Sequence, residues 1–170
     1  LGRPVQISIR FSGFSRRWDW QCSQRFYGGS LLNTGPHPMD QALDLLDIDG
    51  MPTVFSRLDT VLTSGDAEDY AGHPDGARQA AYDLEISSCD AFPGPLYTIQ
   101  GSRGALKATH NLVEWKYFNP EGEPERPFTL EPVCDGEGFP AYCREALTWQ
   151  SFTQELSGTA FDTAVAKYYD

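Results

Sequence analysis

The sequence predicts an α+β fold, in which helices pack on one face of a predominantly antiparallel open sheet. A strand pattern and a helix pattern come first, several strand patterns with short turns follow, and two helix patterns close the chain. Consecutive strands with short turns pair antiparallel, and helices grouped outside the strand run gather on one face. A length of 170 residues suits one domain, which we place at residues 1–170.

The strand predictions rest on alternation of apolar and polar side chains. In the segment 5–11, Val5, Ile7 and Ile9 share one face, as in a half-buried strand. In the segment 80–88, three apolar side chains alternate with Asp83 and Glu85. The remaining predictions are a strand over 53–63, a polar loop or weak strand over 64–79, a hairpin over 97–108 and a strand over 112–118.

Three helices are predicted. The first has Gly35 as its N-cap, Pro36 and Pro38 at its first and third positions, and runs to about residue 47. Its apolar stripe is expected to consist of Met39, Leu43 and Leu46. The others cover 141–156, before Gly158, and 159–170. A chain that begins in a strand and ends within a helix pattern is expected to be a fragment.

Composition and charge exclude several classes of partner. The net charge of −11 disfavours nucleic acid and anionic membrane surfaces. No run approaches the ~20 apolar residues of a membrane helix, and no signal-peptide pattern is present. The four cysteines form no C-x-x-C pair, which favours free cytosolic thiols and a cytoplasmic protein.

The stretch YGGSLLNTGPHPMD, residues 27–40, places His37 between two prolines. Its two glycines allow close approach of a backbone or a ligand, and Asn33 and Asp40 flank the histidine. Histidine suits proton transfer near neutral pH. Alternatively, His37 hydrogen-bonds only locally, Asn33 caps a turn, and Asp40 complements the positive end of the helix dipole.

The same stretch resembles the G-G-x-x-x-D-x-G-x-H-x-x-D segment of the glucose–fructose oxidoreductase/inositol dehydrogenase (Gfo/Idh/MocA) family. Gly28, Gly29, Gly35, His37 and Asp40 match it, and Asn33 stands where the family most often has Asp. Three more stretches resemble the family in order along the chain: LGRPVQISIRF, WDWQ and YTIQGSRGAL. The resemblance covers nearly the whole chain.

The resemblance implies the C-terminal substrate-binding and oligomerisation domain of an oxidoreductase. The sequence has no G-x-G-x-x-G after a strand, so NAD or NADP would be bound by an N-terminal Rossmann domain that this fragment lacks. By carry-over, His37 is the acid/base beside the reacting carbon, with Asn33 at its partner's position. The expected substrate is a small-molecule sugar or polyol, such as an inositol, oxidised at a secondary alcohol.

Other residues are candidates for substrate binding. Trp18 and Trp20 could pack on a sugar, or be buried in the core or an interface. Arg17 and Arg25 could bond hydroxyls or a carboxylate, or be solvated; Asp40 completes the predicted substrate-binding residues. We also expect a homo-oligomer formed through the sheet face opposite the helices.

Two further readings stay open. A non-catalytic relative would keep the fold for dimerisation or ligand binding, and Asn33 in place of Asp favours it. A metal-dependent hydrolase built from His37, Asp40, Asp69 and His73 lacks a recognisable metal-binding spacing.

Overall fold

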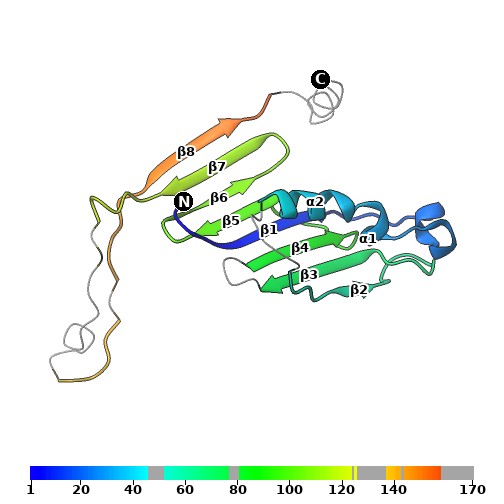
Figure 1. Cartoon of the computed structure of the whole chain (residues 1–170), viewed down its shortest axis with the longest axis horizontal. Coiled ribbons are helices and arrows are strands. Elements are labelled where there is room, and N and C mark those ends of the chain that lie inside the picture. Colours follow the sequence, from blue (N-terminus) through cyan, green and yellow to red (C-terminus); the bar gives the residue numbers. More distant parts are fainter. Residues whose placement is uncertain (46–51, 77–80, 124, 126–136, 143, 158–170) are drawn as a thin grey trace.

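The computed structural model describes residues 1–45, 52–76, 81–123, 125, 137–142 and 144–157. Its described strands form one eight-stranded sheet in the order β2-β3-β4-β1-β5-β6-β7-β8 (Figure 1). The strands are β1 (Pro4–Ser12), β2 (Arg57–Asp59), β3 (Tyr70–Gly76), β4 (Ala81–Ser87), β5 (Tyr97–Gly101), β6 (Gly104–Ala108), β7 (Leu112–Tyr117) and β8 (Gln150–Glu155). The predicted α+β class with a predominantly antiparallel open sheet is confirmed.

One strand pair departs from the antiparallel arrangement. β1 pairs parallel with β4 on one side and antiparallel with β5 on the other. The chain leaves β1, passes through the helices and through β2 and β3, and returns in β4 alongside its starting strand (Figure 1). The first strand in sequence therefore lies in the middle of the sheet, and the ends of β1 and β4 point the same way.

Four short helices follow β1. Two are single 3-10 turns, η1 (Trp20–Cys22) and η2 (Gln24–Phe26), and two are α-helical, α1 (Ser30–Asn33) and α2 (Pro36–Leu45). The Gly35 carbonyl accepts a hydrogen bond from the Met39 amide, which confirms Gly35 as the N-cap of α2. Trp20 begins the helical turn η1, and the Asp19 carboxylate caps this turn by accepting a hydrogen bond from the Gln21 amide.

The core lies where α2 packs on β1 and β4. Ile7, Ile9, Tyr82 and Leu84 form it with Ala42 of α2. The apolar stripe predicted for α2 was wrong: the helix buries Pro38 and Ala42, while Met39 is 38% and Leu43 is 55% exposed. Small side chains one turn apart let the helix approach the sheet closely, so the bulkier ones stay outside. Leu46 lies outside the described residues.

The strand register separates two faces of the sheet. Ile9, Leu84 and Tyr97 are paired with one another and lie on the helix side, and the same register places Val113 and Trp115 there. The opposite face carries charged side chains that pair across strands: Arg10 with Asp83 at 3.4 Å, and Lys107 with Glu114 at 2.8 Å. The helices α1 and α2 pack on the half of the sheet formed by β1, β3 and β4 (Figure 1).

The helix predicted over 141–156 was wrong. Residues 150–155 form the edge strand β8, which pairs antiparallel with β7. Phe152 stacks between two aromatic rings of β7, with centroid distances of 5.4 Å to Trp115 and 5.8 Å to Tyr117. Cross-strand aromatic contacts of this kind outweigh a weak helical periodicity. The helix predicted over 159–170 lies outside the described residues.

The structure confirms some of the other strand predictions and corrects the rest. The strands over 80–88 and 112–118 and the hairpin over 97–108 are confirmed as β4, β7 and the β5–β6 pair. The strand over 53–63 was too long, since only the three residues of β2 pair with β3. The sequence predicts a polar loop or weak strand over 64–79, and residues 70–76 of this segment form β3.

Candidate functional site

A cleft of about 520 Å³ opens at the carboxyl ends of the parallel strands β1 and β4. Its lining mixes polar and apolar side chains and comes from the strand ends, the segment 15–34, the segment 63–69 and two further turns. The residues that the argument below uses are Arg10, Arg17, Gln21, Ser30, Thr34, Glu68 and Asp69. Crevices beyond the carboxyl ends of parallel strands are common ligand sites.

The glycine pair shapes one wall of the cleft. A Cβ on Gly28 would collide with the backbone of Gln21, and one on Gly29 would collide with the carboxylate of Glu68. Gly29 also has φ +110°, which side chains rarely adopt. The interpretation that these glycines permit close approach of another backbone is confirmed at Gly28. At Gly29 the approaching group is the Glu68 side chain, whose Oε1 accepts a hydrogen bond from the Leu31 amide.

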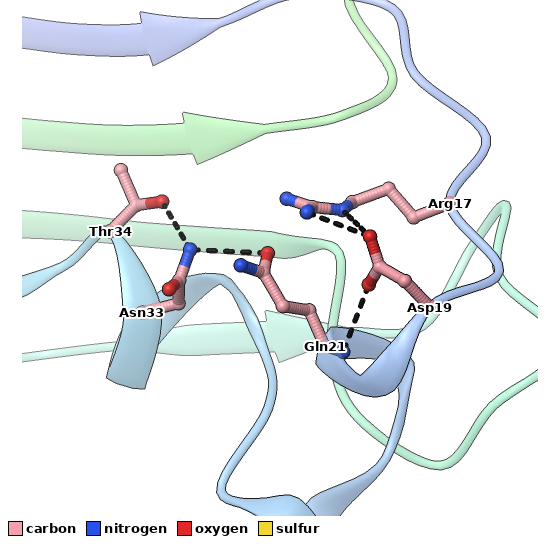
Figure 2. Close-up of polar contacts among 5 residues, drawn as sticks. All are labelled: Arg17, Asp19, Gln21, Asn33 and Thr34. Atoms are coloured by element: carbon pink, nitrogen blue, oxygen red, sulfur yellow. Dashed lines mark hydrogen bonds and ion pairs between the residues drawn. The ribbon is translucent and has the colours of Figure 1, made fainter.

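A chain of polar contacts runs along the cleft from Arg17 to Thr34 (Figure 2). The Arg17 guanidinium donates from Nε and Nη2 to Oδ2 of Asp19, at 3.2 and 2.9 Å. Oδ1 of Asp19 accepts from the Gln21 amide at 2.9 Å. Nδ2 of Asn33 donates to Oε1 of Gln21 at 3.1 Å and lies 3.5 Å from Oγ1 of Thr34. Arg17 and the Gln21 amide together lower the pKa of Asp19.

Asp69 anchors another wall. The residue is 8% exposed, and its carboxylate accepts hydrogen bonds from three consecutive amides, those of Val61, Leu62 and Thr63, at 2.6–2.8 Å. Burial raises the pKa of Asp69, but the three amides outweigh it and hold the pKa below its usual value. Asp69 thus fixes the turn that presents Thr63 to the cleft.

The predicted catalytic residues are not joined to each other. His37 is exposed in the first turn of α2, and its backbone amide donates to the carbonyl of Thr34, whose residue lines the cleft. The side chain of Asn33 is engaged by Gln21 and Thr34. Among the described residues no hydrogen bond joins Asn33 to His37, and neither residue lines the cleft.

Of the predicted substrate-binding residues, one lines the cleft and the others lie outside its lining. Arg17 lines the cleft and also a neighbouring hollow that Trp18 lines with it. Trp18 is 97% exposed, so burial in the core of this chain is excluded for it. Trp20 is exposed. Arg25 lies over the ring of Phe26 at 5.9 Å, outside the cleft lining.

Asp40 is exposed on α2, outside the cleft lining. Within the described residues no three His, Cys, Asp or Glu side chains gather as a metal site. Asp69 of the suggested hydrolase set is occupied by backbone amides.

Cys22 and Cys89 are free thiols, as predicted for them. In the part of the chain that the structure describes, no helix has the length and apolar character needed to cross a membrane.

Sequence reasoning missed several cleft residues. Gln21 belongs to the WDWQ stretch, but its spacing from Asn33 gives no indication that the two side chains are hydrogen-bond partners. Glu68 and Asp69 sit in the acidic run DAED, which is typical of a solvated loop. Their partners are backbone amides, and a sequence gives no signal for those contacts.

Comparison with known proteins identifies a family that matches the chain. The family model of the GFO/IDH/MocA C-terminal domain matches residues 1–107, more than half of the chain. No curated protein matches the sequence.

Solved structures share the fold at low identity. An oxidoreductase from Bacillus cereus has a TM-score of 0.67 at 14% identity, over 99% of this chain and 48% of that one. An NAD-binding protein from Listeria innocua has a TM-score of 0.61 at 15% identity, over 98% and 49%. An oxidoreductase described as putative, from Klebsiella pneumoniae, has a TM-score of 0.54 at 23% identity, over 64% and 30%. The chain thus spans half or less of the length of these structures. By its match over residues 1–107, this chain belongs to the GFO/IDH/MocA family as a C-terminal domain.

Proposed function

We propose that this chain is the substrate-binding domain of an NAD(P)-dependent oxidoreductase that oxidises a secondary alcohol of a sugar, an inositol or a related polyol. The observation that carries the proposal is the cleft at the ends of β1 and β4, whose lining includes several polar side chains, in a chain that belongs to this family. A sugar presents many hydroxyl groups, and side chains such as Arg17, Gln21 and Thr34 offer matching hydrogen-bond donors and acceptors.

The nucleotide belongs to another part of the full-length protein. The described residues do not fit a dinucleotide, because no glycine-rich turn leads from a strand into a helix. The glycines of the β5–β6 hairpin join two antiparallel strands, and Gly104 is covered by the backbone of Lys116 and by Tyr117. In the part of the chain that the structure describes, no helix N-terminus follows them to receive a pyrophosphate. We therefore assign nucleotide binding to an N-terminal Rossmann domain outside residues 1–170.

The part of this chain in the reaction is to hold the alcohol and to accept its proton. The nicotinamide would supply the oxidising chemistry by taking the carbinol hydride. His37 takes the hydroxyl proton on its imidazole, so that the alcohol becomes a ketone and the ring becomes an imidazolium. Its exposure at the start of α2 leaves the ring accessible to a substrate held against a further domain. A positioned base contributes roughly 10²–10⁴-fold to the rate.

The test is an absorbance assay at 340 nm on the full-length protein. The panel contains hexoses, inositols and sugar acids, each with NAD⁺ and with NADP⁺. We expect nucleotide reduction with at least one member of the panel. Absence of turnover with every member, together with no binding of either nucleotide to the full-length protein, would contradict the proposal.

One observation favours a second candidate, a non-catalytic ligand-binding or dimerisation module. Asn33 is committed to Gln21 and Thr34, so it supplies no charged partner for His37. Calorimetric titration of the same sugars into the full-length protein, beside the absorbance assay, separates the two candidates: a module of this kind binds sugars without reducing nucleotide.

A further inference from the structure

The sheet ends in two edge strands that differ in how they are protected (Figure 1). Edge strands expose backbone donors and acceptors, and proteins usually shield them by keeping them short or by placing charges on them. β2 has three residues, two of which, Arg57 and Asp59, form an ion pair at 2.8 Å. β8 has six residues, all of them exposed, and its one charged side chain is Glu155 at its end. β8 therefore has neither kind of protection.

The hydrogen bonds to β7 show which backbone groups of β8 are free. The Leu156 amide donates to the carbonyl of Asn111, and the two strands continue in the same register. In an antiparallel pair, residues whose backbone groups point to the neighbouring strand alternate with residues whose groups point away from it. The backbone groups of Ser151, Thr153 and Glu155 therefore point away from β7. Among the described residues no hydrogen-bond partner meets these groups.

A second copy of the chain is the partner that this edge fits. A twofold axis at Thr153 places two β8 strands antiparallel, with Thr153 opposite Thr153 of the partner subunit and Ser151 opposite Glu155 of the partner subunit. All the outward groups then pair, which gives about six backbone hydrogen bonds. Sliding one strand by two residues in either direction leaves one outward residue of each strand without an opposite residue in β8. The strand is thus complementary to itself in one register.

The charges on the outer face of the sheet favour the same register. Ser151 and Lys116 are neighbours across β8 and β7 on that face. The twofold axis brings Glu155 of the partner subunit to the other side of Ser151, two strand spacings or about 10 Å from Lys116. Because serine is small, the two long side chains of opposite charge can approach each other above it. A twofold axis at Glu155 would instead oppose two carboxylates, which is destabilising.

The helix-side face adds an aromatic contact. Phe152 stacks on Trp115 and Tyr117 and is still 41% exposed. In the same register, Phe152 lies opposite Gln154 of the partner subunit and diagonal to Phe152 of the partner subunit. Diagonal neighbours are about 7–8 Å apart, which is within reach of aromatic side chains. The aromatic clusters of the two copies therefore meet and lose exposed apolar surface, which favours association.

We propose that two copies of this chain pair through the free edges of β8, so that their sheets are continuous across a twofold axis at Thr153. This contact differs from self-association through the charged face, which stacks one sheet on another. It is also independent of the proposed activity, because no residue of β8 lines the cleft.

Disulfide cross-linking of the full-length protein tests the register. In a hydrogen-bonded antiparallel pair the Cα atoms are about 5.5 Å apart, which is within the range that a disulfide spans. Under copper-phenanthroline oxidation, Thr153→Cys should therefore form a covalent dimer. Ser151→Cys alone should not, because its two copies lie about 14 Å apart along the strand. Ser151→Cys mixed with Glu155→Cys should cross-link, whereas Glu155→Cys alone should not.

The controls assign the cross-link to the free edge. Wild type, which keeps every native cysteine, gives the background. Thr153→Pro, added to both members of the mixed pair, should abolish their cross-link, because proline lacks the outward N–H and leaves the bonds to β7 in place. Lys107→Glu alters the charged face and should leave the Thr153→Cys dimer unchanged. Cross-linking of Ser151→Cys alone, no covalent dimer with Thr153→Cys, or loss of that dimer with Lys107→Glu would each overturn the inference.

Discussion

The Asp69→Asn substitution tests how the wall of the cleft is held. Asp69 is nearly buried, with Oδ2 accepting from Leu62 and Thr63 and Oδ1 from Val61. Asparagine keeps one carbonyl oxygen, so two bonds survive without charge assistance, and its amide group opposes the Val61 N–H. Hydrogen bonds to a charged group are worth about 1.5–3 kcal/mol and neutral ones about 1. We expect the free energy of unfolding to fall by about 2–4 kcal/mol.

The pH dependence provides an independent check of the same carboxylate. The folded pKa of Asp69 lies below its unfolded value. The stabilising contribution is therefore fully present above the unfolded pKa, about 3.9, and is lost as the pH falls through the folded pKa. The difference in unfolding free energy between wild type and Asp69→Asn should be largest near pH 7 and shrink below about pH 4.

Urea denaturation followed by circular dichroism at several pH values measures this difference. Asp66→Asn is the matched control, because Oδ1 of Asp66 accepts a single amide, that of Gln24, at an exposed position. It should cost about 1 kcal/mol or less. A loss below about 1 kcal/mol for Asp69→Asn, or a loss that stays constant down to pH 3, would refute the assigned role of the three amides.

Four further predictions concern the glycine pair, the amide pair, assembly and nucleotide binding. Gly29→Ala should lower the thermal midpoint of unfolding by several degrees, because φ is +110° and the Glu68 carboxylate fills the space that a Cβ would need. Gly13→Ala should leave the midpoint unchanged, because a Cβ there meets open space. Equal midpoints for the two variants would contradict the role assigned to Gly29. Asn33→Asp should turn the Gln21 amide over, because the new carboxylate accepts a hydrogen bond where the Asn33 amide now donates one to Oε1 of Gln21; unchanged side-chain amide resonances of Gln21 in an NMR spectrum would contradict the orienting role of Asn33. Light scattering should show self-association of the chain through its charged sheet face, weakened by Lys107→Glu, and a strict monomer at high concentration counts against this. Calorimetry should detect no binding of NADH or NADPH by residues 1–170, and micromolar affinity would disprove the assignment of the nucleotide to another domain.

Local patterns predicted most of the strands. In β4 the alternation of buried and half-buried side chains follows the sequence, with Tyr82, Leu84 and Ile86 inside. The hairpin of β5 and β6 likewise follows from local turn chemistry. The parallel pairing of β1 with β4 joins residues more than 70 positions apart, and no local pattern carries that information. β8 was mistaken for a helix because its partner strand, not its own periodicity, determines its conformation.

For the candidate site, the sequence predicted residue types better than contacts. Arg17 was predicted as a binding residue and lines the cleft. The family resemblance places Asn33 at the position of a partner for His37, whereas its amide contacts Gln21, twelve residues earlier. The role of His37 stays a prediction. Its side chain is exposed, and the chemistry proposed for it depends on a substrate and a domain beyond this chain.

The measurement that tests the central claim most directly is kcat for His37→Ala in the full-length protein. The variant is compared with wild type on the best substrate of the panel, over a range of pH, with its fold verified by circular dichroism. The account predicts that kcat falls at least about tenfold, the low end for loss of a positioned base, and that the limb of the pH profile due to the histidine disappears. Near-wild-type turnover with an unchanged pH profile would contradict it, and would leave His37 with no more than its place in the first turn of α2.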